Sequence, residues 1–412
     1  MAVDNTIFYN GFYCKLRASM GPNYGTPNDY QIHNAETIYR MLIVFGYTPA
    51  AACGILGNMQ TESSMSPAAL QTGKLNLLPN DGEHFADLTN NAMLPFYDEQ
   101  YGGCGTGLIQ WDGKTNTPPA GNKITSFASR YQSIWYDGEM QIFRLEAEYI
   151  LDPSGGGGIN GHTEQFWISS RYTPSTDWST FRSWTGTPED AADVFRLCLE
   201  RSSDSPAGIQ HRRDNARQWY NRFSSMSVAT VVTGRHNAMM AYLYRDSGYT
   251  YAQYDCISFV NLVRRKLGIP TIPNGTNTLW RTTGLQWKGT MQECLDTFGT
   301  IPQGAYLFKW YDQPAPPPWD HDGLGDWNHI GIYTLLGKGV MQSGGYDDAR
   351  TGVADCYFHP TQTDPPLAYD WWNYVAIGDN IIMPATGAFN LPWFIITILN
   401  KRRKKYFELR QH

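Results

Sequence analysis

Charged side chains are scarce in this sequence. They make up 17% of 412 residues, with 32 basic against 38 acidic side chains and a formal net charge of −6. Disordered chains combine much charge with few aromatic residues, whereas aromatic residues here reach 14%. The composition therefore excludes a disordered chain. The acidic excess argues against nucleic acid as the main ligand, because phosphate backbones select basic surfaces.

Cysteine is sparse, and no two cysteines have CxxC spacing, which argues against a zinc ribbon or a thioredoxin-like motif. An odd number of cysteines, seven, leaves at least one free thiol. The histidines lack HxxxH-type pairing, and His321, between Asp320 and Asp322, falls in an expected loop where solvated charge is the default. We therefore expect no metal site and no cofactor.

Targeting and membrane signals are weak. The first residues have no basic stretch followed by an apolar run, so we expect no secretory signal. Near the C-terminus, Ile381–Leu399 is mostly apolar and precedes the basic run Lys401–Lys405, but Pro384 and Pro392 interrupt it. We expect 381–412 to be a docking segment that packs on its own domain or on a partner protein. Membrane contact through 381–405 stays an alternative.

The order of patterns predicts a multidomain α+β protein, without internal repeats. We expect an N-terminal extension (1–34), a mainly helical domain (35–224), a linker rich in Ser, Thr and Val (225–235), and a domain of helices followed by an antiparallel sheet (236–380). The apolar spacing predicts helices over 36–45, 50–59, 125–151, 188–200, 212–223 and 236–245, and one that begins at Cys256. Strands are expected over 304–310, 329–335, 339–343 and 372–377.

A lone carboxylate marks the first candidate site. Glu62 follows an apolar helix that Thr48 and Pro49 are expected to start. A carboxyl group in a partly apolar cleft keeps its proton more readily, as a general acid must. The Gly-rich segment before Gln110 and Trp111 offers an amide and an indole for an N-acetylated sugar. The structural alternative is a solvated glutamate at a helix end.

Residues 35–223 resemble the phage tail-type lysozymes, which are related in pattern to goose-type lysozymes and lytic transglycosylases. The resemblance is carried by Gly46-Tyr-Thr-Pro49, Ala52–Asn58, Glu62-Ser63, Gly107-Leu-x-Gln-Trp111 and the later segment with Phe195, Glu200-Arg201, Arg212-Arg213, Ala216 and Trp219-Tyr220. It implies that Glu62 is the catalytic acid. The nearest second acids are Asp98, Glu99 and Asp112, none of which lies in a diagnostic motif, so hydrolysis and transglycosylation both stay open.

A cysteine, a histidine and a glutamine form the second candidate site. Cys256 follows Asp255, a natural N-cap, so we expect the helix dipole and unpaired amides to lower the pKa of its thiol. His329 begins an alternating strand and is the candidate base. If the next strand pairs with it, the amide oxygen of Gln342 can accept the Nδ1 proton of His329. A core cysteine and a polar strand edge are the structural alternative.

About 236–380, the sequence resembles the NlpC-type cell-wall cysteine peptidases, a papain-like group. The matching residues are Asp255-Cys256-Ile-Ser258-Phe-Val260, Gly268-Ile-Pro270, Ile301–Phe308 and His329-Ile-Gly-Ile-Tyr333. The resemblance implies a papain-like domain and a role for Tyr254 in lining the oxyanion region. Ile257-Ser258 replaces the usual Ser-Gly, and Gln342 fills a position that is commonly His. Because related CHAP amidases share this chemistry, the bond cut is either a stem-peptide bond or the muramyl amide.

Together the two halves predict a bifunctional peptidoglycan hydrolase that a phage carries on its tail tip and that opens the host wall during entry. The expected partners are bacterial peptidoglycan and other tail proteins. The alternatives are a lysis-stage endolysin, for which no separate wall-binding module is evident, and a structural tail-tip protein with degenerate enzyme domains.

Overall fold

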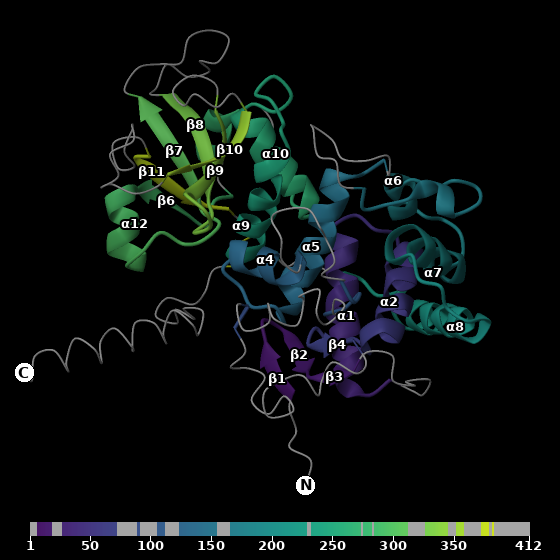
Figure 1. Ribbon diagram of the computed structural model, residues 1–412. Helices are drawn as coiled ribbons and strands as arrows, with labels where there is room; N and C mark the ends of the chain where they lie inside the picture. Colours follow the sequence, from purple (N-terminus) through teal and green to yellow (C-terminus); the bar gives the residue numbers. More distant parts are fainter. Residues whose placement is uncertain are drawn as a thin grey trace, which may run out of the picture.

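A computed structural model gives the fold of this chain. It describes residues 6–18, 27–71, 89–90, 105–111, 123–154, 165–228, 232–272, 275–281, 284–311, 326–344, 352–357, 372–378 and 381–382. The architecture is α+β, as the sequence pattern predicts: helices dominate the first half, and an antiparallel sheet lies in the second (Figure 1).

The first half consists mainly of helices. Its helical elements are α1 (Asp29–Val44), α2 (Pro49–Ser63), α4 (Lys123–Arg130), α5 (Gly138–Leu151), the 3₁₀ turn η7 (Ser169–Arg171), α6 (Trp178–Arg182), α7 (Pro188–Phe195), the π-helical turn η8 (Arg196–Glu200) and α8 (Pro206–Phe223). Its strands are β1 (Thr6–Tyr9), β2 (Phe12–Lys15), β3 (Arg17–Ala18) and β4 (Ala69–Leu70). The pair β1 and β2 is antiparallel, and β3 runs parallel to β4.

Helix α2 lies at the centre of this half, and it starts as the sequence predicts. The hydroxyl of Thr48 accepts the backbone N–H of Ala51 at 3.3 Å, and Pro49 occupies the first turn, where its missing N–H costs nothing. Nearly every α2 side chain is buried, because α1, α7 and α8 all pack against the helix. A helix enclosed on all sides carries apolar residues on every face, as this one does.

Two glycines let the neighbouring helices approach α2 closely. A Cβ at Gly54 would lie 2.6 Å from the Cβ of Ala191 on α7. A Cβ at Gly57 would lie 2.5 Å from the backbone oxygen of Arg212 on α8. Both distances are shorter than any van der Waals contact, so only glycine fits at this separation of backbones. The close approach brings the last turn of α2 against α8.

The expected helix over 125–151 is two helices in the structure. Helix α4 ends at Arg130, and α5 begins at Gly138, where Asp137 caps the N-terminus by accepting the N–H of Met140 at 3.1 Å. The helical spacing continues across the break, so periodicity alone could not place it. The cap residue is the local signal that marks the new start.

The second half begins with helices and continues with strands. Its helical elements are α9 (Gly234–Leu243), the 3₁₀ turn η9 (Tyr244–Asp246), α10 (Cys256–Lys266), α11 (Thr276–Arg281) and α12 (Met291–Phe298). Its strands are β5 (Val232–Thr233), β6 (Trp287–Thr290), β7 (Tyr306–Tyr311), β8 (Asp326–Tyr333), β9 (Gly339–Gly344), β10 (Gly352–Tyr357), β11 (Tyr374–Ile377) and β12 (Ile381–Ile382).

A sheet in the order β10-β9-β8-β7-β11-β6, with every pairing antiparallel, forms the centre of this half. Helix α10 packs against β8 and β9, whereas α12 contacts β6 and β11 (Figure 1). Alternate residues of one strand enter different apolar clusters: Ile330 packs in the cluster shared with α9 and α10, whereas Tyr333 packs in the cluster shared with α12. The expected arrangement of a helix on an antiparallel sheet is thus confirmed.

The segment between the halves carries structure of its own. Strand β5 lies within the expected linker and pairs in parallel with β12, so residues 381–382 return to the start of α9. The rest of the expected docking segment, 383–412, lies outside the described residues. Among the helices that the structure describes, none combines the length and the apolar character needed to cross a bilayer.

Candidate functional site

Glu62 lies in the last turn of α2, where the sequence predicts it, and is 9% exposed. Its Oε1 accepts a charge-assisted hydrogen bond from Nη2 of Arg212. Arg212 comes from α8 and is fully buried. The glutamate is therefore not a solvated side chain at a helix end, because a buried guanidinium fixes its carboxyl group.

Arg212 is the partner of Glu62 that the sequence reasoning did not predict, since it named Arg212 only as one of the residues that carry the resemblance. It also binds Oε2 of Glu200 at 2.8 Å, Oδ2 of Asp204 at 2.6 Å and Oδ1 of Asn58 at 2.8 Å. A signal for it was present: the buried stripe of α8 consists of Arg212, Ala216, Trp219 and Phe223. An arginine in the apolar stripe of a helix must be paired, since an unpaired buried charge is costly.

Gln110 and Trp111 lie in the turn that follows Gly107, and both make internal contacts. The amide of Gln110 donates to the backbone oxygen of Gly107 at 2.9 Å, and its φ of +52° closes the turn. Trp111 is 7% exposed, and its indole N–H donates to Oε1 of Glu148 at 3.1 Å. The ring therefore packs in the core in this structure, and stacking on a sugar would require it to become accessible. The expected second acids, Asp98, Glu99 and Asp112, lie outside the described residues.

Cys256 opens α10, as the sequence predicts, and Asp255 caps the helix by accepting the N–H of Ser258 at 2.8 Å. Helix α10 packs on β8, where the backbone N–H of Ile330, the residue after His329, acts to lower the pKa of the thiol. The fold thus brings the helix that carries the cysteine to the strand that carries the histidine.

The sequence analysis predicts a lowered pKa for the Cys256 thiol, and in the structure this prediction is wrong. Burial, and to a smaller extent the charge of Asp255, raises the pKa of Cys256 to about 12. Hydrogen bonds from the backbone of Ile330, Ile257 and Cys256 itself act in the opposite direction but are outweighed. The helix N-terminus does stabilise the thiolate, but the desolvation that accompanies 7% exposure dominates.

His329 and Gln342 meet across neighbouring strands, as predicted, although through the other ring nitrogen. Nε2 of His329 lies 2.6 Å from Oε1 of Gln342, whereas the sequence reasoning assigned this contact to Nδ1. The register explains the meeting: Gln342 lies opposite Gly331, which shares a strand face with His329. An amide oxygen only accepts, so Nε2 carries the proton and Nδ1 keeps the lone pair that a base uses. The ring also stacks on Trp372, with centroids 5.6 Å apart.

Tyr254, the expected oxyanion-region residue, lies in the turn before α10. Its backbone oxygen accepts the hydroxyl of Ser343 on β9, and its ring packs against Tyr249 with centroids 4.9 Å apart. The turn is thereby tied to the strand that carries Gln342. The role of Tyr254 in the oxyanion region stays a prediction.

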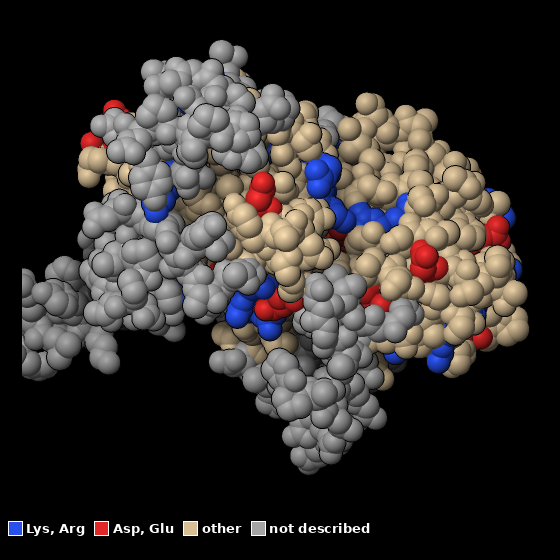
Figure 2. Space-filling model, turned by 90° about the horizontal axis from the view of Figure 1, so that it is seen from above, with Lys and Arg blue, Asp and Glu red and all other residues tan. Residues whose placement is uncertain are grey.

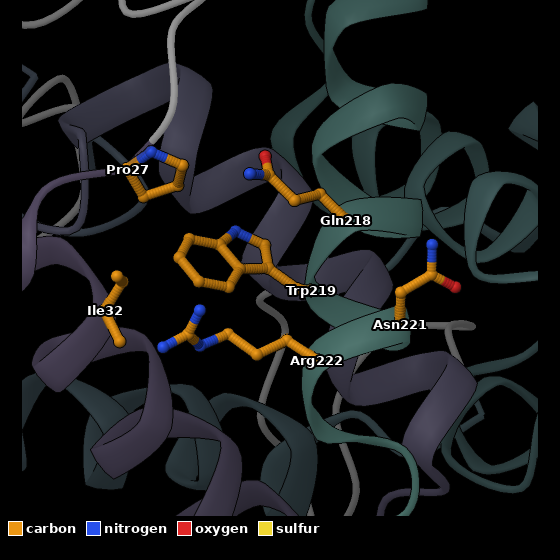
Figure 3. A pocket seen from close by; sticks show the side chains of 6 residues that line it. All are labelled: Pro27, Ile32, Gln218, Trp219, Asn221 and Arg222. Atoms are coloured by element: carbon orange, nitrogen blue, oxygen red, sulfur yellow. The ribbon is translucent and has the colours of Figure 1, made fainter.

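A pocket of about 320 Å³ lies on α8, two helical turns beyond Arg212. It is lined by Pro27, Ile32 and four α8 residues, with the indole of Trp219 at its centre (Figure 3). The lining residues are Pro27, Ile32, Gln218, Trp219, Asn221 and Arg222. This pocket therefore includes neither Glu62 nor Cys256.

Basic side chains form a short row across the middle of the face shown in Figure 2, and acidic side chains lie around it. The described part of this face is thus mixed in sign. A phosphate backbone is bound by a continuous basic footprint, which this face does not present among its described residues.

The helical half presents Glu62 at the end of a buried helix, on a scaffold of packed helices. Residues 33–223 match the family model described as phage tail lysozyme. The match includes Glu62, Arg212, Glu200 and Asp204, and it supports phage-associated degradation of peptidoglycan by a muramidase-type activity. It also supports a location associated with the phage tail.

Proposed function

We propose that this chain is a phage tail peptidoglycan hydrolase in which Glu62 is the general acid that cuts the glycan strand. The observation that carries the proposal is the position of Glu62: it ends α2, lies within the residues that match the lysozyme family, and is held by Arg212. Because a buried, paired carboxyl group cannot rotate freely, it can be aimed at one oxygen of a bound substrate.

The chemistry assigned to Glu62 is proton transfer to the glycosidic oxygen. The carboxyl proton moves to that oxygen as the bond from the anomeric carbon to it breaks. The carboxylate that results accepts the charge-assisted hydrogen bond from Arg212. In hydrolysis, water adds to the anomeric carbon and its proton returns to Glu62. In transglycosylation, a hydroxyl of the same sugar takes the place of water and leaves an anhydro end.

A second activity is proposed for the C-terminal half, with Cys256 as nucleophile and His329 as base. It is supported by the packing of α10, which carries Cys256, on β8, which carries His329, and by the pairing of His329 with Gln342. The thiol would pass its proton to Nδ1 of His329 and attack the carbonyl carbon of a stem peptide or of the muramyl amide, and the leaving amine would take that proton. Water would then release the acyl group from the sulfur.

Burial of the Cys256 thiol, with its raised pKa, favours a different candidate for this half, namely a structural tail-tip domain that has lost its catalysis. The choice between them rests on activity. We also propose a role in host entry, with the enzyme acting on the wall from the tail tip; the tail lysozyme match over residues 33–223 supports it. Release at lysis, as an endolysin, is the alternative.

The test uses the full chain and purified peptidoglycan. Reducing ends and new amino groups are counted for the unsubstituted protein, Glu62→Gln, Cys256→Ala and the double variant, and the released fragments are identified by mass spectrometry. Glu62→Gln should abolish new glycan ends and leave new amino groups unchanged, whereas Cys256→Ala should do the reverse. Anhydro ends would identify transglycosylation.

Two matched controls accompany these variants. Glu189→Gln removes an acidic side chain that pairs with Arg217 at the surface, and Cys294→Ala removes a buried cysteine of α12. Neither should change product formation. Glycan cutting by Glu62→Gln at the unsubstituted rate would refute the first assignment. Absence of new amino groups from the unsubstituted protein would favour the structural candidate for the second half.

A further inference from the structure

Three carboxyl groups share one guanidinium at the end of α2. Arg212 is fully buried and donates through Nη2 to Glu62, through Nη1 to Glu200 at 2.8 Å and through Nε to Asp204 at 2.6 Å. Its Nη1 also binds the amide oxygen of Asn58. The three acidic groups come from α2, from η8 and from the segment that precedes α8, and the tertiary structure brings Glu62 of α2 to the other two.

The charges of this cluster do not balance when every group is ionised. One guanidinium would face three carboxylates, and Arg196 is the other cation that acts on Glu200. Oε1 of Glu200 is buried and makes no hydrogen bond. A buried carboxylate oxygen without a donor is unfavourable, whereas a protonated oxygen at that place removes the charge.

The ionisation of Glu200 follows this geometry. Burial raises its pKa to about 8, and the charges of Glu62 and Asp204 act in the same direction, while Arg212 opposes them. Glu200 and Glu62 bind the two terminal nitrogens of the same guanidinium, so the charge of Glu62 acts on Glu200. Two like charges this close do not both form at neutral pH unless the environment compensates them.

We propose that Glu200 is a positioning residue of the glycan-cutting site, which shares Arg212 with Glu62 so that the two carboxyl groups keep one proton between them at neutral pH. This inference rests on the proposed role of Glu62 as general acid. It explains how a glutamate that is paired with arginine can still supply a proton, because the pair as a unit remains singly protonated until Glu200 ionises. Asp204 and Asn58 complete the hydrogen bonding of Arg212 and fix its orientation.

The experiment compares the pH profile of glycan cutting by the full chain with those of Glu200→Gln and Glu200→Asp. In the unsubstituted protein, activity should persist up to about pH 8. Glu200→Gln keeps the shape of the side chain but removes the group that titrates. The alkaline limb of the pH profile of glycan cutting should therefore move to lower pH in this variant. The expected loss is at least about tenfold near neutral pH, since one pKa unit corresponds to a factor of ten. Activity should recover in acid. Glu200→Asp should restore part of the alkaline limb.

A second readout does not depend on activity. A carboxyl group whose pKa rises on folding stabilises the fold below its unfolded pKa, and that contribution is lost as the pH rises through the folded value, here about 8. The free energy of unfolding should therefore fall more steeply between about pH 5 and pH 8 in the unsubstituted protein than in Glu200→Gln.

The outcomes separate the two proposals. If Glu200→Gln lowers activity by the same factor at every pH, or if its stability has the same pH dependence as the unsubstituted protein, the shared proton is refuted. If the unsubstituted protein cuts no glycan but the stability difference is found, the proposed function of Glu62 fails while the proton on Glu200 stands. Glu189→Gln, at the surface pair with Arg217, is the control for removal of a carboxylate.

Discussion

Arg235, the second residue of α9, donates to Oδ2 of Asp137, the N-cap of α5, at 2.6 Å. The carboxylate of Asp137 is fully buried, and Arg235 also reaches Glu139 at 3.0 Å. These contacts join the helical half to the half that carries the sheet, and Lys266 of α10 adds a contact with Glu146 of α5 at 3.3 Å. Charged groups thus hold α5 against the second half.

Replacement of Arg235 should therefore lower the stability of both halves. Arg235→Ala leaves the buried carboxylate of Asp137 without its cation, which is expected to lower the free energy of unfolding by about 3 kcal/mol. Calorimetry should show a lower transition temperature for the chain. Arg130→Ala removes an exposed ion pair with Asp246 between the same halves and should cost less than about 1 kcal/mol. Equal losses in the two variants would contradict a special role for Arg235.

Glu139 should make the protein sensitive to acid. Burial alone would raise its pKa, but Arg235 and His236 lower it more strongly, to about 2 from 4.5. Because the pKa falls on folding, the stabilising contribution is present above about 4.5 and is lost as the pH falls through the folded value of about 2. Denaturant unfolding at several pH values in this range should show the decline, and Glu139→Gln should reduce it. Glu36→Gln, at an exposed pair with Arg40, should leave the slope unchanged.

Gly57 should tolerate no side chain. In Gly57→Ala the new Cβ would lie 2.5 Å from the backbone oxygen of Arg212 and 2.8 Å from the Cβ of Ala216. The gain of about 1 kcal/mol in helix propensity is smaller than the cost of forcing α8 away, which we expect to reach about 2 kcal/mol or more. Displacement of α8 also separates Arg212 from Glu62. Glycan cutting should therefore fall together with stability, whereas Gln218→Ala, an exposed change on α8, should affect neither.

Cys256 should react slowly with iodoacetamide at neutral pH in the native protein. Its raised pKa of about 12 leaves almost no thiolate, so the rate should increase about tenfold per pH unit as the solution becomes more alkaline. Peptide mass spectrometry follows each cysteine separately, and Cys356, which is less buried, serves as the accessible comparison. Rapid labelling of Cys256 near pH 7 would instead support the acidic thiol that the helix N-terminus predicts.

Gln342 should fix the tautomer of His329, the histidine that it binds. Gln342→Leu removes the acceptor for Nε2 of His329 but keeps a side chain of similar size on β9. Release of new amino groups should become slower while the protein still folds, because the tautomer of His329 with the proton on Nε2 is no longer favoured. Gln342→Asn keeps the amide and should retain more turnover than Gln342→Leu. Equal turnover in both variants would show that the contact has no part in the reaction.

Local patterns were sufficient for many elements. Thr48 and Pro49 predicted the start of α2, Asp255 predicted the start of α10, and the alternation from His329 predicted β8. Caps and periodicity act within a few residues, so a sequence records them directly. The hairpin of β8 and β9 was also predictable, since its turn is short and its strands adjoin in the chain.

The environment of each candidate reactive group depends on the tertiary structure and not on local sequence patterns. The sequence alone pointed to the residues to which we assign the proposed chemistry, Glu62 and Cys256 above all, and determined on which helices they lie. Only the tertiary structure decided that Glu62 shares Arg212 with Glu200 and Asp204, that the indole of Trp111 faces Glu148, and that burial outweighs the helix dipole at Cys256. Charge pairing and desolvation depend on groups that are distant in the chain and close in space, and no local pattern encodes that distance.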